Sequence, residues 1–385
     1  MIIHTKNILK NIGLKFIDKE KDISNFLKSE EKLKILLSYG KKTTNEIYKE
    51  LNLSPRAIRK CLLKMENKKE VKRIKGKEIN KKVRYSDSWI LKTKKIIKRV
   101  PQNKIFAHYR NEHYNKGYRQ HYMFFPKSIN INEDHISAIG FFDAEGSKTK
   151  PKSTEVVNSE PSLIRLFIKF LDYFNIKKEN LSYRIIFNNK LPYLLKITKK
   201  EINNNAIKFW SSQVKIPINK DIKLSYVGKL KGKSRKRVIK YGSLNINYNN
   251  VLFRKFLFNL IKTVKSQVKT EKESVSYLRG YFAGEAYVGA YDKQIQVGSK
   301  DKSQLIFCKT LLEKIGVRSS ICNETSTCPP RLLISDLKSF IILESKNLFK
   351  FHQDKKRNLI KKILNYRSVD NALRKKLERK LKKLK

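Results

Sequence analysis

Two nine-residue segments decide the fold: residues 138–146 read AIGFFDAEG, and residues 278–286 read LRGYFAGEA. An offset of 140 residues superposes them, and the same ungapped register contains eight identical pairs between residues 140 and 171 of the first copy. The pairs include Gly140 with Gly280, Glu145 with Glu285, and Phe167 with Phe307. So many identities in one register indicate a duplicated domain.

Each copy predicts the same order of elements. An apolar helix ends in a small residue and an acid, and a β-hairpin follows, then an amphipathic helix, two more strands and a closing helix. The sequence therefore predicts an α+β fold built from two αββαββα units. The predicted ranges are 147–158, 161–174, Tyr183–Phe187, Tyr193–Ile197 and 203–213 in the first copy, and 287–298, 301–315, Val317–Cys322, Arg331–Ile334 and 336–347 in the second.

The paired motifs and the element order resemble the LAGLIDADG family of homing endonucleases over residues 132–360. The resemblance implies that the two motif helices pack against each other at a pseudo-two-fold axis, with Gly140 and Gly280 at the contact. It further implies that the strands form two saddle-shaped sheets on the major groove of a long DNA target.

The acid at the end of each motif has a chemical use that does not depend on the family name. Phosphodiester hydrolysis is assisted by divalent ions, and Mg²⁺ is commonly held by one or two carboxylates with phosphate and water. Glu145 and Glu285 would supply one carboxylate for each DNA strand and are the candidate catalytic and metal-binding residues. The alternative is that each is a surface acid, although a carboxylate at a helix C-terminus is electrostatically unfavourable.

The second copy departs from the family pattern at two positions. Ala283 and Ala286 stand where the first copy has Asp143 and Gly146. Loss of the aspartate is tolerable if that residue is structural, and Ala286 requires an ordinary backbone angle after the acid. Lys355 and Lys356 follow the last helix of the second copy, where the family often places an active-site lysine.

Residues 31–95 resemble a winged helix-turn-helix. Ser54 and Pro55 form a helix start, and the following helix turns its cations outward; Val71–Ile74 and Lys82–Tyr85 are expected to form a basic wing. DNA is the favoured partner, and protein contact is the alternative. The candidate DNA-binding residues are Arg56, Arg59, Lys60, Lys64, Arg73, Lys75, Lys82 and Arg84.

The remaining segments are defined by composition. Residues 96–131 are interpreted as a basic, aromatic linker, for which nucleic-acid contact, a solvated role and metal binding by its histidines are all considered. The expected boundaries are a helical extension (1–30), the winged domain (31–95), the linker (96–131), repeat 1 (132–214), a basic insertion (215–270), repeat 2 (271–352) and a basic C-terminal helix (353–385).

The charge balance favours a polyanionic partner. The chain has 385 residues with 88 Lys and Arg against 34 Asp and Glu, a net charge of +54. Its 40% hydrophobic content is too high for a disordered basic tail. The four cysteines lack metal-ligand spacing, and neither a signal peptide nor a membrane span is evident, so a soluble, cytoplasmic protein is expected.

The main hypothesis is a monomeric, site-specific, Mg²⁺-dependent endonuclease that makes a double-strand break in duplex DNA. Two alternatives stay open: a transcription regulator that keeps the LAGLIDADG fold without cutting, and a maturase that binds intron RNA. Retention of both Glu145 and Glu285 favours the nuclease, because the resemblance implies that regulators with this fold usually lose the motif acids.

Overall fold

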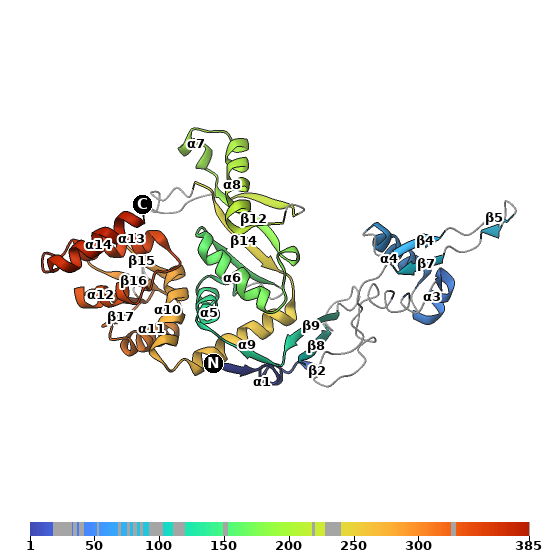
Figure 1. The fold of residues 1–385 in the computed structure, drawn as a ribbon, viewed down its shortest axis with the longest axis horizontal. Coiled ribbons are helices and arrows are strands. Elements are labelled where there is room, and N and C mark those ends of the chain that lie inside the picture. Colours follow the sequence, from blue (N-terminus) through green and yellow to red (C-terminus); the bar gives the residue numbers. More distant parts are fainter. Residues whose placement is uncertain are drawn as a thin grey trace. The chain divides into compact units, whose positions relative to one another are not determined.

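The chain separates into two compact units, which Figure 1 shows as a ribbon. The computed structural model describes residues 1–17, 33, 37, 42–51, 54–67, 71–74, 78–79, 83–84, 88–91, 103–110, 120–148, 153–217, 220–227, 240–324 and 329–384. The N-terminal unit comprises His4–Ile129, and the C-terminal unit comprises Asn130–Lys385 with Met1–Ile3. Short strands β1 (Ile2–His4) and β10 (Ser128–Asn130) lie at the boundary. Within the described ranges no helix is long and apolar enough to cross a membrane.

The N-terminal unit contains a three-stranded sheet that the sequence did not predict. Helix α1 (Thr5–Asn11) contacts a sheet of order β2–β8–β9, formed by β2 (Lys15–Ile17), β8 (Lys104–Arg110) and β9 (Gln120–Pro126). Apolar residues of the hairpin β8–β9, among them Phe106 and Phe125, are buried. The prediction of a linker at 96–131 is therefore wrong for these strands, as is a purely helical extension over 1–30. Residues 111–119, with His113, Tyr114, Tyr118 and Arg119 among the predicted basic and aromatic contacts, lie outside the described part.

The rest of this unit is a small helical core with short strands. Helices α3 (Thr44–Leu51) and α4 (Pro55–Asn67) enclose a cluster of buried apolar side chains. Ser54 Oγ accepts a hydrogen bond from the Ala57 N–H at 3.3 Å, which confirms the predicted start of α4. The cluster consists of Leu33, Leu37, Ile47, Ile58, Leu62, Met65 and Val71.

The strand pairing of the expected wing differs from the prediction. Strand β4 (Val71–Ile74) pairs with β7 (Ser88–Leu91), which also pairs with β3 (Lys42–Thr43). Strands β5 (Glu78–Ile79) and β6 (Val83–Arg84) instead pair with each other. A longer, two-part hairpin thus replaces the single pair predicted from Val71–Ile74 and Lys82–Tyr85, because the residues that complete the sheet come after the apparent end of the wing.

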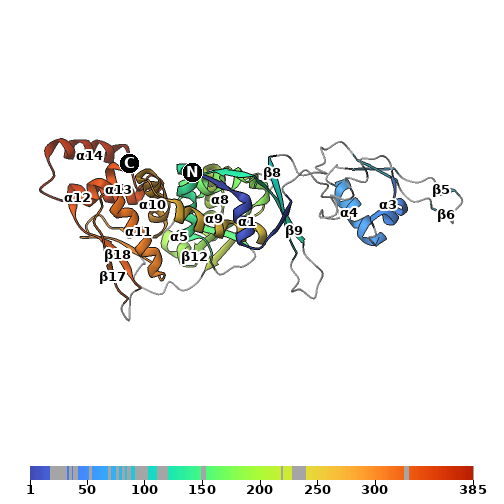
Figure 2. The same cartoon turned by 90° about the horizontal axis from the view of Figure 1, so that it is seen from below.

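Two helices at the centre of the C-terminal unit lie side by side (Figure 1 and Figure 2): α5 (Glu133–Glu145) and α10 (Glu271–Glu285). A Cβ atom on Gly140 would lie closer than 3.0 Å to the Tyr277 carbonyl oxygen. A Cβ atom on Gly280 would equally overlap the Ser137 carbonyl oxygen. Only glycine permits this backbone contact.

The first half of the unit contains a four-stranded sheet of order β11–β14–β12–β13. Helices α6 (Pro161–Tyr173) and α9 (Val251–Gln267) contact both this sheet and α5. The ring of Phe142 on α5 stacks on that of Phe167 on α6. A 3₁₀ turn (Lys178–Asn180) precedes β12. The strands are β11 (Thr154–Asn158), β12 (Ser182–Asn188), β13 (Ile222–Val227) and β14 (Ser243–Tyr248).

Two predictions for this half are wrong. The predicted strand Tyr193–Ile197 is largely helical, because α7 (Leu191–Leu195) begins there with Pro192 in its first turn. The predicted insertion at 215–270 is not separate from the repeat, since β13, β14 and α9 all lie within it and complete the sheet and its cover. The extra elements between β12 and β14 are α7, α8 (Lys199–Val214) and the parallel strand β13.

The second half is simpler. Its sheet has the order β15–β16–β18–β17, formed by β15 (Ala286–Val288), β16 (Ile295–Gly298), β17 (Ser320–Cys322) and β18 (Arg331–Ile334). Helices α11 (Lys302–Lys314) and α12 (Leu337–Ser345) complete it. The C-terminal segment is two helices rather than the single one predicted, α13 (Gln353–Leu364) and α14 (Asn371–Lys383), because Asp370 caps a new helix start.

The contact between α5 and α10 gives a direct test of the fold. Gly280→Ala should destabilise the C-terminal unit by about 3 kcal/mol or more, because the added methyl forces two backbones apart. Gly298→Ala is the matched control: nothing lies within 4 Å of its Cβ position, so a change below about 0.5 kcal/mol is expected. Chemical unfolding measures both, and equal stability of the two variants would contradict the described contact.

Candidate active site

The candidate site lies where α5 and α10 end. Glu145 and Glu285 are the last residues of the two helices. A Cβ atom on Gly284 would lie 2.9 Å from Cγ of Glu145, so the Glu145 side chain reaches across to the end of the other helix. The backbone contact thus brings the two predicted acids to one place.

The residue after each acid leaves the helix in the same way. Gly146 has φ −67° and ψ 135°, and Ala286 has φ −72° and ψ 132°. Both pairs of angles are ordinary extended backbone, which alanine adopts without strain. Replacement of the motif glycine by Ala286 therefore leaves the position of Glu285 undisturbed.

Both carboxyl groups hold their proton more tightly than an exposed glutamate does. Burial, and then the negative charge of Glu285, raise the pKa of Glu145 to about 7. Burial also raises the pKa of Glu285, against the opposing effect of Lys148 and Lys355. Two neighbouring, partly buried carboxylates are stabilised in their ionised forms by a nearby positive charge.

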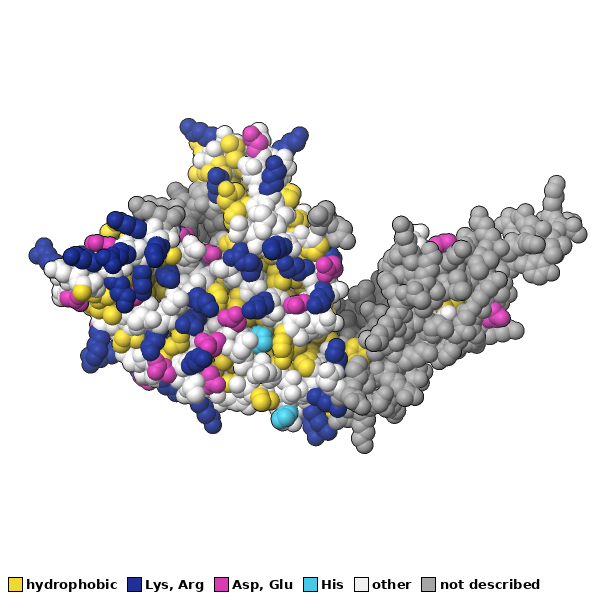
Figure 3. Space-filling model, viewed as in Figure 1, with side chains coloured by type: hydrophobic (Ala, Val, Ile, Leu, Met, Phe, Trp, Pro, Cys, Tyr) yellow, Lys and Arg dark blue, Asp and Glu magenta, His cyan; other side chains and the backbone are white. Residues whose placement is uncertain are grey.

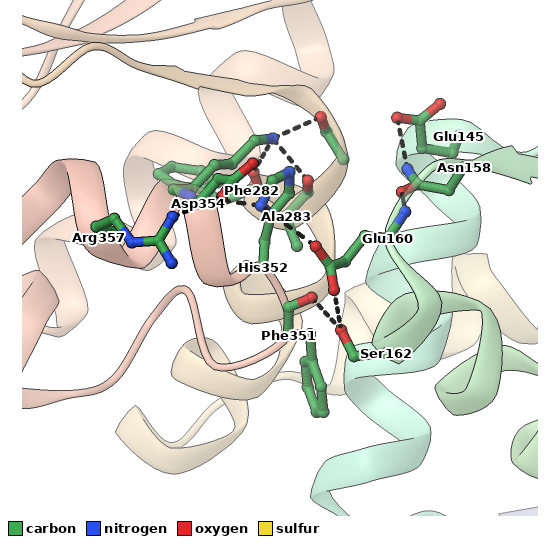
Figure 4. A network of polar contacts seen from close by, with 12 residues as sticks. Glu145, Asn158, Glu160, Ser162, Phe282, Ala283, Phe351, His352, Asp354 and Arg357 are labelled. Atoms are coloured by element: carbon green, nitrogen blue, oxygen red, sulfur yellow. Dashed lines mark hydrogen bonds and ion pairs between the residues drawn. The ribbon is translucent and has the colours of Figure 1, made fainter. Parts of the chain in front are cut away.

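Lys355 supplies part of that positive charge. Its buried ammonium group donates hydrogen bonds to three carbonyl oxygens in the last turn of α10: Phe282 at 3.2 Å, Ala283 at 2.6 Å and Gly284 at 2.9 Å (Figure 4). A cation at a helix C-terminus is favourable because the last carbonyls of a helix carry partial negative charge; of these three, the Phe282 oxygen also accepts a hydrogen bond from the Ala286 N–H. Lys355 also lowers the pKa of both acids, and so favours their ionised forms.

Asn158 distinguishes the surroundings of the two acids. Its Nδ2 donates to Glu145 Oε1 at 3.4 Å, while its Oδ1 accepts from the Glu160 N–H at 2.8 Å (Figure 4). In the second copy the corresponding residue is Gly298, which has no side chain to play this part. Glu145 is therefore oriented by an amide, whereas Glu285 has Lys148 as an electrostatic neighbour; Lys355 acts on both acids.

The structure explains why one motif aspartate is absent. Asp143 Oδ2 accepts hydrogen bonds from the Tyr277 hydroxyl and from Lys265 Nζ, the latter at 3.2 Å, and Gln304 donates to the same hydroxyl at 3.1 Å. In the first copy Ser137 and Ile164 correspond to Tyr277 and Gln304. A carboxylate at Ala283 would lack such a network, so the role of Asp143 is structural.

The open faces of the two sheets carry polar side chains that the sequence analysis missed. In the first sheet, Arg184 and Lys223 are exposed neighbours in register, while the alternate residues of β12 are buried. In the second sheet, Tyr287 is 58% exposed and Arg331 donates to Gln296 Oε1 at 2.9 Å. Two-residue alternation in the strands would have identified these positions had the strand register been known.

The candidate DNA-binding residues of the N-terminal unit fall into two groups. Arg56, Arg59, Lys60 and Lys64 lie on α4 with exposed side chains. Arg73 and Arg84 belong to β4 and β6, but their side chains, like Lys75 and Lys82 altogether, are outside the described structure. Leu63, an apolar residue of the same helix, is 38% exposed.

The acid pair fits a divalent metal of the magnesium type. No group of three or more His, Cys, Asp or Glu that could hold a metal is found in the described ranges. Two carboxylates without further protein ligands suit an ion that completes its shell with water and phosphate oxygens, as Mg²⁺ does. Burial and then the negative charge of Glu285 raise the pKa of Glu145, and a bound cation would offset both effects.

One family model matches the chain. Residues 272–347 match the LAGLIDADG-like domain. This range extends from α10 to α12 and includes Glu285 and the second sheet, so it agrees with the predicted second LAGLIDADG copy. No curated protein sequence matches the chain.

Solved structures of LAGLIDADG proteins also resemble the chain at low identity. I-DmoI in complex with DNA and Mn is 14% identical and covers 57% of this chain and 98% of that chain, with a TM-score of 0.29. Its complex with DNA and Ca covers 58% and 93% at the same identity and TM-score. Full-length DUF199/WhiA from Thermotoga maritima is 12% identical over 66% of this chain and 69% of that chain, with a TM-score of 0.33.

The raised pKa of Glu145 predicts a dependence of stability on pH. A carboxyl with a pKa of about 7 when folded and 4.5 otherwise binds its proton more tightly in the folded state, so its charged form destabilises the fold above pH 7. Glu145→Gln should therefore be more stable than the parent at pH 8, by up to about 3 kcal/mol. Most of this gain should disappear by pH 5, where the folded parent is protonated.

The control for this measurement is Glu313→Gln, which removes an exposed acid on α11. Denaturant unfolding at both pH values should show no pH-dependent gain for the control. Equal stability of the parent and Glu145→Gln at pH 8 would contradict the buried, acid-paired environment.

Proposed function

We propose that the protein is a LAGLIDADG-type endonuclease that makes a double-strand break at a specific site in duplex DNA. The observation that carries the proposal is the convergence of Glu145 and Glu285 at the ends of two helices whose backbones touch. A protein that only binds DNA gains nothing from two partly buried acids whose pKa is raised. In their ionised forms these two acids destabilise the fold, and a catalytic role in phosphodiester cleavage would account for their presence at the helix ends.

The duplication suits the site to cut both strands of a DNA duplex. In this proposal the two halves descend from one αββαββα unit, and the first has acquired α7, α8 and β13 between two strands. Each half supplies one acid and one sheet. A single chain then offers two halves to an asymmetric site without a second copy, so the active form is a monomer.

The side chains around the acids have separable tasks. Glu145 and Glu285 would hold Mg²⁺, which when bound polarises the scissile phosphate and lowers the pKa of water. Asn158 orients the Glu145 carboxylate. Lys355 fixes the last turn of α10 and keeps both acids closer to their ionised forms, which bind a cation.

DNA would be read by the open sheet faces. Arginine pairs with guanine and glutamine with adenine through two hydrogen bonds in the major groove, and Arg184, Gln296 and Arg331 have the required groups. Lysines such as Lys223 would contact phosphates. The strand faces thus provide sequence recognition, and the acid pair between the halves provides the chemistry.

The N-terminal unit would add affinity as an accessory winged helix-turn-helix. Its helix α4 presents four exposed cations, the pattern expected of a helix in the major groove. In this view it anchors the enzyme next to the cut site and takes no part in the chemistry.

The cutting test uses purified protein, Mg²⁺ and a plasmid that carries the DNA flanking the protein's own gene. The parent should linearise the plasmid, and Glu145→Gln or Glu285→Gln should abolish linearisation while duplex affinity changes little. Glu313→Gln is the control and should cut normally. No linearisation by the parent at any Mg²⁺ concentration, with salt-sensitive duplex binding retained, would contradict the nuclease and favour a non-cutting regulator. Preference for intron RNA would favour a maturase.

The accessory role is tested on α4. Replacing Arg59 and Lys60 with Gln should weaken duplex binding roughly tenfold and reduce the slope of log affinity against log salt by about 1.8, two phosphate contacts' worth. Cleavage at saturating protein should keep its rate. Lys6→Gln with Lys10→Gln removes the same charge from α1 and should leave affinity unchanged; equal losses in both variants would contradict a specific role for α4.

A further inference from the structure

Helix α14 is fixed to the body of the second half by one face. Leu377 on that face is only 1% exposed, and Lys380 forms a 2.7 Å ion pair with the buried Glu344 of α12. Arg374 donates to the carbonyl oxygens of Leu364 and Tyr366, both at 3.1 Å. Leu377 and the polar contacts beside it therefore dock the helix, which gives it a fixed orientation.

The opposite face of α14 is a ridge of cations. It borders a shallow hollow of about 360 Å³, which is lined by Ala372, Lys375, Lys376, Arg379 and Lys383 and also by Lys380, the partner of Glu344. Glu378 is the single acid in the sequence from 371 to 384. Within the described structure, no carboxylate pairs with Lys375, Lys376, Arg379, Lys382 or Lys383. In Figure 3, Lys and Arg side chains gather over this end of the unit.

The stability of the helix does not explain this ridge. Lys375, Arg379 and Lys383 follow one another at a spacing of four residues, and each such like-charged pair costs about 0.2–0.5 kcal/mol. The helix dipole favours cations only in the last turn, and Lys375 and Arg379 lie before it. A polyanion bound to this face would offset the repulsion between these like charges.

We propose that the exposed face of α14 binds the phosphate backbone of the duplex DNA arm that extends beyond the second sheet. The proposal rests on the proposed function, which places the core of the site on the two sheets. Three cations at four-residue spacing cover about 12 Å along the helix, the length of three to four base pairs. Such a contact lengthens the site on one side without reading its sequence.

The position of the ridge follows from its attachment. Helix α13 carries Lys355 at the acid pair, and its Asn358 donates to the Val288 carbonyl oxygen of β15 at 2.9 Å. The same helix packs against α14, so one rigid element joins the acids and the second sheet to the ridge. DNA that extends beyond the second sheet would therefore pass close to the exposed cations of α14.

The test compares full-length proteins on mixed-sequence DNA duplexes of about 20 and about 40 base pairs, since backbone contacts do not depend on sequence. The variant replaces Lys375, Arg379 and Lys383 with Gln. Its affinity should fall about tenfold on the longer duplex and less than about twofold on the shorter one, with the salt slope on the longer duplex reduced by up to about 2.7. The control replaces Lys255 and Lys262 of α9 together with Lys269, which follows that helix; all three side chains are exposed, and the variant should behave as the parent.

A second variant guards against a folding defect. Lys375→Arg with Lys383→Arg keeps the charges and should retain parental affinity on both duplexes. The inference is overturned if the Gln variant binds the longer duplex like the parent, if it loses as much on the shorter duplex, if the α9 control loses as much, or if its loss is greater on duplex RNA than on DNA. Failure of the parent to bind either duplex would instead overturn the proposed function.

Discussion

The contact between the backbones of α5 and α10 is the constraint on which the rest of the structure depends. Gly140 and Gly280 leave no room for a Cβ atom, and this closeness brings the ends of the two helices together. Each half can then place its sheet on its own side of the helix pair. A larger residue at either glycine would separate the acids and the sheets at once, so one steric condition determines both the fold and the site.

The ionised acids of the candidate site lower the stability of the fold. Glu145 and Glu285 repel each other in a partly buried place, and Lys355 offsets this only in part, since it also binds the carbonyls of α10. The surface around them is strongly basic, in keeping with the net charge of +54. In the proposed function the cations would attract DNA, while the acids at the helix ends would hold the metal ion.

The sequence was sufficient for features that depend on local or repeated patterns. The motif helices, their glycines and the terminal acids follow from the 140-residue repeat, and the start of α4 follows from Ser54 and Pro55. Features that depend on distant pairing were missed: β13 and β14 join a sheet across the long segment after β12, and β7 pairs with β4 beyond the apparent wing. The Asp143 network, which accounts for Ala283, is likewise visible only when α5, α9, α10 and α11 are assembled.

The most direct test of the central claim is an NMR pH titration of the Glu145 carboxyl carbon, in the parent and in Glu285→Gln. The two acids are predicted to share one site, so removing the charge of Glu285 should lower the pKa of Glu145 from about 7 toward the value that burial alone produces. An unchanged Glu145 pKa in Glu285→Gln would show that the acids do not interact, and would contradict the convergence of the two helices on a common centre.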